Sequence, residues 1–166
     1  MYTIRPATMA DADCVVKIAH HTWWPTYGDI LTTEQITYML GVIYVSDKIA
    51  EQIESGEQQY LVLEEDGQPV AFASYSPRSE DTSVYKLHKL YCLAAAQGKG
   101  YGKQLIEAVV HATQQAGAGA IELNVNRYNK AIDFYKKLGF TIAYDEDVPI
   151  GPYFMNDYVM RKLIGN

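Results

Sequence analysis

Apolar and polar residues alternate in short runs along the chain, and these runs predict β-strands. A period of two with β-branched and aromatic residues, bounded by turn residues, is typical of half-buried strands. The Asp66-Gly67 pair also favours a hairpin between two of the runs. The predicted strands are Tyr2–Ala7, Gln59–Glu64, Pro69–Ser76, Val84–Leu93, Ala120–Val125, Phe140–Tyr144 and Tyr153–Leu163.

Apolar residues spaced three and four apart predict five helices among these strands. The first follows an N-cap at Thr8, runs from Ala10 to Trp24 and is expected to end at Pro25 and Gly28. The others are a helix through Leu40 capped by Thr32 or Thr33, a helix through Glu54 capped by Ser46, and helices over Gly100–Ala116 and Asn129–Leu138.

The order of these elements favours an α/β fold of the α+β kind. Hairpins come first and helical crossovers come later, which predicts a mixed, mostly antiparallel sheet of about seven strands flanked by helices. The 166 residues, 48% of them hydrophobic and 20% charged, suit one domain with its own core. No linker or repeat divides the sequence, so residues 1–166 are expected to form a single domain.

Charge and composition exclude several classes of protein. The net charge of -6 disfavours nucleic acid as a partner. No apolar run approaches the roughly 20 residues that span a bilayer, and the first residues do not resemble a signal peptide, so we expect a cytoplasmic protein without membrane contact. Cys14 and Cys92 have neither CxxC spacing nor a histidine cluster, so neither a disulfide nor a metal site is expected.

The stretch from Lys86 to Gln104 carries the clearest chemical signal. An apolar strand is followed by three near-consecutive glycines, Gly98, Gly100 and Gly102, and then at once by a helix. Glycines let a ligand approach the backbone, and the first N–H groups of a helix attract an anion. The pattern indicates a phosphate or pyrophosphate site, with a simple tight turn as the alternative. Lys103 breaks both GxxxxGK[ST] and GxGxxG.

A resemblance to a known family decides between these alternatives. The stretch Gln97–Gly102 matches the [RQ]-x-x-G-x-[GA] acetyl-CoA loop of the GCN5-related N-acetyltransferase superfamily. Downstream, Asn124–Phe140 resembles its second signature, with an asparagine, an alanine, Phe-Tyr and Gly-Phe in the family's order. The resemblance covers essentially the whole chain and departs from the family at Ala94, where proline is common.

The resemblance implies an acetyl-CoA-dependent N-acetyltransferase in which acetyl-CoA is the co-substrate and no metal takes part. The strand before the loop would pair with the pantetheine arm, and the loop would hold the pyrophosphate. Asn129 would bind the pantetheine or a phosphate, or cap the helix that follows. The implied cofactor-binding residues are Leu90, Tyr91, Cys92, Gln97, Gly98, Lys99, Gly100, Tyr101, Gly102, Lys103 and Asn129.

Three side chains are candidates for moving protons. Tyr135 would be the acid that protonates the leaving thiolate, or else it is a packed core tyrosine. His88 is the first candidate for the base, because a period of two places it with Leu90 and Cys92, and some family members, serotonin N-acetyltransferase among them, carry histidine there. Glu122 is the rival base.

Asn124 occupies the position where some protein N-acetyltransferases of the family carry glutamate. Asparagine cannot act as a base, but it could order a water molecule that relays the proton. Cys92 could act as a covalent nucleophile, although a small buried strand residue is the favoured interpretation.

The acceptor is expected to be a primary amine of a small molecule, including polyamine-like cations, or of a peptide, acetylated by direct transfer. The alternative is a catalytically weak CoA-binding regulatory or sensing module on the same fold. A homodimer through an exposed strand is compatible with the pattern. The aromatic residues expected around the acceptor are Trp23, Trp24, Tyr27, Tyr38, Tyr153 and Phe154.

Overall fold

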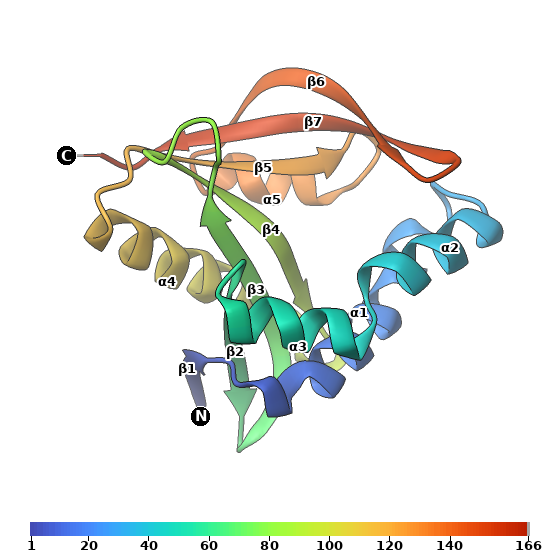
Figure 1. The fold of residues 1–166 in the computed structure, drawn as a ribbon, viewed down its shortest axis with the longest axis horizontal. Helices are drawn as coiled ribbons and strands as arrows, with labels where there is room; N and C mark the ends of the chain where they lie inside the picture. Colours follow the sequence, from blue (N-terminus) through green and yellow to red (C-terminus); the bar gives the residue numbers. More distant parts are fainter. Residues whose placement is uncertain (166) are drawn as a thin grey trace.

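A computed structural model describes residues 1–165, which form one seven-stranded sheet with helices on both faces (Figure 1). The strand order is β1-β2-β3-β4-β5-β7-β6, and every neighbouring pair is antiparallel except β4 and β5. The predicted mixed, mostly antiparallel sheet is therefore confirmed. The strands are β1 Tyr2–Pro6, β2 Gln59–Glu65, β3 Gln68–Pro77, β4 Val84–Cys92, β5 Ala120–Asn126, β6 Thr141–Ile150 and β7 Tyr153–Leu163.

The helices bury one apolar core on each face of the sheet. Leu105 and Val109 of α4 pack on one face with Phe140, and Ile18 of α1 and Met39 of α2 pack on the other. Figure 1 shows α4 to the left of β4, with α1 and α2 to its right. The helices are α1 Ala12–Tyr27, α2 Thr33–Ile43, α3 Ser46–Ser55, α4 Tyr101–Gln115 and α5 Ala131–Lys137, with short 3-10 turns at Met9–Asp11 and Ala94–Ala96.

Two predicted boundaries are wrong for physical reasons. Pro25 lies inside α1 and does not end it. Proline lacks the backbone N–H that would donate a helical hydrogen bond, but the burial of Trp23 and Tyr27 stabilises the last turn. Strand β6 runs to Ile150 and not to Tyr144, although its middle is acidic. An edge strand exposed to solvent accepts such residues, so polarity alone did not mark its end.

The parallel pair at the centre of the sheet separates part of the way along. The register between β4 and β5 runs from Val84 opposite Ala120 to Leu87 opposite Leu123 and then stops. Both strands continue, β4 to Cys92 and β5 to Asn126. The edge of β4 that faces β5 is therefore unpaired over its last residues.

Three other expectations concern the surroundings of the protein. No helix within residues 1–165 is long and apolar enough to cross a membrane. Within the same residues, no group of three or more His, Cys, Asp or Glu side chains is placed to hold a metal ion. The homodimer stays a prediction.

An ion pair fastens the first strand to the start of α1. Arg5 of β1 donates two hydrogen bonds to the Asp11 carboxylate, at 2.8 and 2.9 Å, and a third to Glu64 at 3.0 Å. Asp11 is 7% exposed and also accepts the Thr8 backbone N–H at 2.7 Å. The Arg5 hydrogen bonds hold the pKa of Asp11 below its usual value of 3.8, although burial opposes this.

We expect Asp11→Asn to lower the free energy of unfolding by about 2 kcal/mol at neutral pH. Because the pKa of Asp11 is depressed in the folded state, its stabilisation is present above pH 3.8 and is lost as the pH falls through the folded value. Urea unfolding of both proteins from about pH 7 to pH 2 measures this.

Glu51→Gln on α3 is the control. Glu51 is exposed, so this change should alter the free energy of unfolding by less than about 0.5 kcal/mol. The difference in the free energy of unfolding between Asp11→Asn and the natural protein should disappear at acid pH. A difference that stays the same at acid pH would contradict the ion-pair explanation.

Candidate active site

The gap between β4 and β5 holds a small cavity, here called the central cavity. It has a volume of about 170 Å³. Leu90, Tyr91 and Cys92 of β4 line one side, and Asn124 and Val125 of β5 line the other. Its wall is completed by α1, by Gln97 and by the start of α5, through residues Thr22, Thr26, Tyr27, Gln97, Asn129, Ala131 and Tyr135.

The glycine loop, Gln97–Lys103, borders a second and larger cavity of about 510 Å³, here called the loop cavity. Gly98 and Gly100 adopt left-handed conformations with φ of +83° and +80°, in which a residue with a side chain would be strained. Gly100 is the N-cap of α4, so the N–H groups of the first turn face the loop without helical partners. Backbone N–H groups arranged in this way are suited to binding an anion.

The side chains of the glycine loop line the loop cavity, bind Glu65, or do both. Tyr101 and Lys103 line the loop cavity together with the three glycines. Lys99 forms an ion pair with Glu65 at 2.7 Å, and the Tyr101 hydroxyl donates to the same carboxylate. These contacts lower the pKa of Glu65 and fasten the loop to the end of β2. Lys99 therefore acts first as an anchor of the loop.

Gln97 and Asn129 each make a local bond at the central cavity. The Gln97 side-chain N–H donates to the Cys92 carbonyl at 3.0 Å, which ties the loop to the end of β4. The Asn129 side-chain oxygen accepts from the Ala131 backbone N–H at 2.9 Å, so the expected capping role is present. The Asn129 side chain also lies close enough to the Tyr27 hydroxyl to affect the pKa of Tyr27.

Tyr135 projects from α5 to the junction of the two cavities. It lines both of them, and its ring packs edge-on against Phe134 and Phe140 at 5.3 and 5.8 Å between centroids. Burial, and secondarily the nearby Tyr27 hydroxyl, raises the pKa of Tyr135. The phenol therefore keeps its proton at neutral pH.

The structure corrects the predicted position of His88. A β-bulge interrupts the pairing of β3 with β4, because Ser74 faces Lys89 and Tyr75 faces Leu87, so that His88 has no partner. The bulge breaks the period of two. His88 does not share a face with Leu90 and Cys92, and its ring nitrogen lies 2.6 Å from the Ser76 hydroxyl on the opposite face.

The surroundings of His88 also oppose a role as base. Desolvation by the surrounding protein atoms, followed by the positive charges of Lys86 and Lys89, lowers its pKa to about 3, although the residue as a whole is exposed. Such an imidazole stays neutral at physiological pH and takes up a proton poorly.

Glu122 lies on β5, as Asn124 does, but in the part of the strand that is still paired with β4. The carboxylate is 2% exposed and is held by Arg78 at 2.5 Å on one oxygen and by Arg161 at 2.6 Å on the other. This carboxylate ties the β3–β4 loop and β7 to β5. Its arrangement is that of a structural ion-pair cluster.

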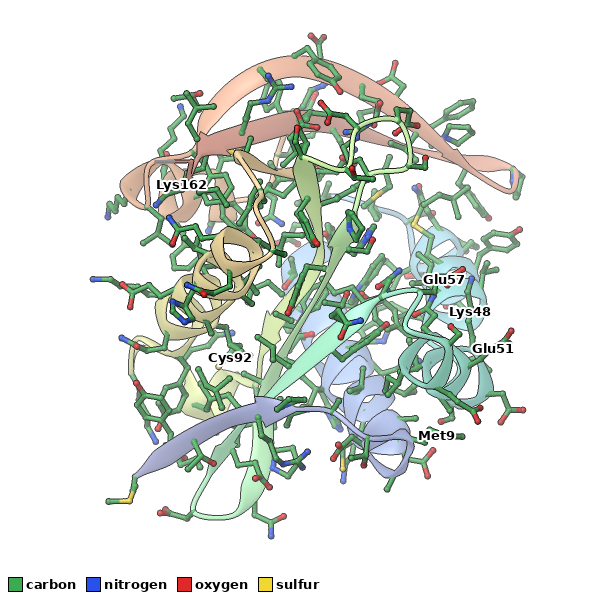
Figure 2. The ribbon with its side chains drawn as sticks, turned by 60° about the vertical axis from the view of Figure 1, so that its left-hand side comes forward. Met9, Lys48, Glu51, Glu57, Cys92 and Lys162 are labelled. Atoms are coloured by element: carbon green, nitrogen blue, oxygen red, sulfur yellow. The ribbon has the colours of Figure 1, made fainter. Side chains whose placement is uncertain are left out.

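Cys92 lies where β4 leaves the sheet beside the start of α4 (Figure 2). Its thiol is half-buried, and burial raises its pKa, which disfavours the reactive thiolate. The structure therefore agrees with a packing role for this side chain.

Only Tyr27 of the predicted acceptor aromatics lines a cavity described here. Trp23 is buried in the core, and Tyr38 packs against Tyr153 with 5.4 Å between ring centroids. A third cavity of about 670 Å³ meets the central one at Thr22, Thr26, Gln97 and Asn129, and gives a second route to it from the C-terminal part of α1.

A polar cluster that the sequence did not reveal lies behind the central cavity. Asn124 donates to Glu146 at 2.9 Å and to Asp157 at 3.3 Å, which brings β5, β6 and β7 together. Asp157 lies outside both sequence motifs, in the last strand of the sheet. The signal was its place between Met155 and Val159, since all three residues are buried on the inner face of β7.

Comparison with known proteins identifies the relatives of this chain. A model of the Acetyltransferase (GNAT) family matches residues 19–140. An uncharacterized N-acetyltransferase of Mycobacterium tuberculosis is 31% identical over 158 residues, which make up 94% of this chain and 100% of the relative.

Two solved structures share the fold over nearly their whole length. The PaiA N-acetyltransferase of Thermoplasma acidophilum in complex with coenzyme A has a TM-score of 0.85 at 23% identity, covering 98% of this chain and 99% of that chain. A putative acetyltransferase of Salmonella typhimurium, with its cofactor acetyl-CoA, has a TM-score of 0.77 at 22% identity, covering 100% of this chain and 95% of that chain.

We expect Glu122→Gln to destabilise the protein by about 2 kcal/mol, because it leaves two guanidinium groups without their buried partner and water screens them only in part. Urea unfolding at neutral pH measures the loss. Glu80→Gln is the matched control, since Glu80 is an exposed partner of Arg78 at 3.6 Å and should contribute less than about 0.5 kcal/mol. Equal losses in the two variants would refute the clustered role of Glu122.

Proposed function

The chain belongs to the acetyltransferase (GNAT) family and is an N-acetyltransferase, and on this premise we propose that it moves the acetyl group of acetyl-CoA directly to a primary amine of a small molecule or peptide. The observation that carries the proposal is the junction of the loop cavity with the central cavity at Leu90, Cys92 and Tyr135. An anion cradle, an unpaired strand edge and a proton donor meet there.

The donor substrate fits the elements around the loop cavity. The N–H groups of Gly98–Lys103 bind the pyrophosphate, and the two left-handed glycines keep that surface clear of side chains. The unpaired edge of Leu90–Cys92 takes the pantetheine arm as if it were an added strand. Asn129, which lines the central cavity, contacts this arm.

Direct transfer requires the amine and the thioester to meet in the central cavity. The amine nitrogen attacks the acetyl carbonyl carbon, the C–N bond forms, and the C–S bond breaks to release a thiolate. The Tyr135 hydroxyl, which lines both cavities, protonates that sulfur. His88 takes up a proton poorly because its pKa is lowered to about 3, and both carboxylate oxygens of Glu122 accept hydrogen bonds from arginines.

The proposal predicts release of coenzyme A thiol from acetyl-CoA when a primary amine is supplied. A panel of alkylamines, polyamines, amino acids and short peptides, followed with a thiol reagent, identifies the acceptor class, and calorimetry with CoA tests the donor site. Absence of both CoA binding and amine-dependent thiol release would overturn the proposed function.

Tyr135→Phe should lower kcat by about 100-fold, because the thiolate then leaves without its proton donor. The ring and its packing remain, so the affinity for CoA should change by less than about twofold. Steady-state rates and calorimetry measure the two effects.

Tyr144→Phe on the exposed β6 strand is the control and should leave kcat unchanged. An unaltered kcat in Tyr135→Phe would remove this residue from the mechanism.

A further inference from the structure

Asp157 of β7 has a carboxylate oxygen that is buried and unused. The residue is 6% exposed, and its Oδ1 atom has no hydrogen-bond partner among the described residues. Its Oδ2 atom accepts only from Asn124, at 3.3 Å. A buried carboxylate without a cation is costly in a folded protein and is retained where it has a task.

The neighbouring cations do not neutralise this carboxylate. The Arg127 guanidinium binds Asp147 at 2.9 Å and donates its Nε–H to the Asp157 backbone carbonyl, not to the side chain. Lys86 on β4 is near enough to lower the pKa of Asp157, yet the pair forms no ion pair within 4.0 Å. The position of a close cationic partner is therefore left to a ligand.

Asn124 presents a second acceptor atom to the same place. Its two amide N–H groups point to the Glu146 and Asp157 carboxylates, which only accept hydrogen bonds when ionised. This pairing fixes the orientation of the amide and leaves its Oδ1 atom for another donor. Asn124 is also one of the residues that line the central cavity.

The location of this corner matches the end of the acetyl-transfer path. Asn124 lines the same small cavity as Tyr135 and Cys92. Tyr27 lines it as well, and the Asp157 charge contributes to raising the pKa of Tyr27, after burial and the Tyr91 hydroxyl. Asp157 is therefore joined to the lining of the central cavity through its hydrogen bond from Asn124.

We propose that Asp157, with Asn124 beside it, binds the ammonium group of the acceptor and takes up its proton before the attack. This inference rests on the proposed function and names the acceptor as a primary alkylammonium. An alcohol of the same length lacks the charge and the N–H donors that the corner requires.

The proton balance closes with the groups present. One N–H bond of the ammonium breaks and an O–H bond forms at Asp157, so a neutral amine attacks the acetyl carbon. When the C–S bond breaks, Tyr135 gives its proton to sulfur and regains one from nitrogen. The products are the amide, the CoA thiol and one proton, which Asp157 releases to water.

The charges that face Asp157 are compatible with this task. Burial is the largest influence and raises its pKa, and Glu146 on β6 adds to the rise. The Asn124 hydrogen bond, Lys86 on β4 and Arg127 after β5 oppose it. A carboxyl group with a raised pKa accepts a proton more readily than an exposed aspartate does.

Asp157→Asn keeps the shape of the side chain and removes the base. We expect kcat/KM for the amine to fall by about 100- to 1,000-fold at neutral pH, with CoA affinity changed by less than about twofold. The variant must draw on the neutral amine in solution, so its kcat/KM should rise about tenfold per pH unit up to the pKa of the amine. A merely structural role would not produce this pH dependence.

The matched control is Asp147→Asn, which removes an exposed carboxylate from the same hairpin and should leave the kinetics unchanged. Thermal unfolding should show Asp157→Asn to be at least as stable as the natural protein, because a buried unpaired charge is lost. A kcat/KM within threefold of the natural protein at every pH would overturn the proposal.

A binding measurement on the natural protein is independent of the folding of any variant. Ligand-observed NMR with the CoA-loaded protein compares n-butylamine with 1-butanol, and the amine should bind at least tenfold more tightly. Equal binding would refute ammonium recognition. Amine binding without thiol release for any acceptor would instead reject the proposed function and leave the recognition site standing.

Discussion

The separation of β4 from β5 after Leu87 and Leu123 is the constraint on which the candidate site depends. Two parallel strands that stay paired leave no room between them and no spare backbone groups. Here the bulge at His88 falls at the point where pairing ends, and a bulge adds twist and bends the strand that carries it. The gap, its unpaired edge and the cavity between the strands all follow from that one irregularity.

Leaving backbone groups unpaired inside a protein is unfavourable, so the rest of the fold must hold the gap open. The two cores do this from opposite faces. Phe72 and Tyr91 pack with α1 and α3 on one face, while Leu87 and Leu105 pack with α4 on the other. Each core contains residues from both sides of the gap, Leu87 with Leu123 in one and Phe72 with Met155 in the other, so closing the gap would disrupt both cores. A ligand backbone can satisfy the exposed edge at less cost.

Most of the fold followed from local patterns, and so did the donor half of the site. The period-two runs found every strand, and the glycines with the helix after them indicated an anion site before any resemblance was considered. The errors concern features that tertiary contacts impose. Pro25 is carried within α1 by the burial of its neighbours, and the acidic middle of β6 is extended because β7 pairs with it.

The sequence by itself determined the order of elements, the glycine loop and the position of Tyr135, because each depends on neighbours close in the chain. The tertiary structure decided which side chains share a face across the gap. The bulge placed His88 on the opposite face from Leu90 and Cys92. A strict two-residue alternation does not allow for the extra, unpaired residue of a bulge. The meeting of Asn124 with Asp157 likewise depends on β7 lying between β5 and β6, which only the folded sheet establishes.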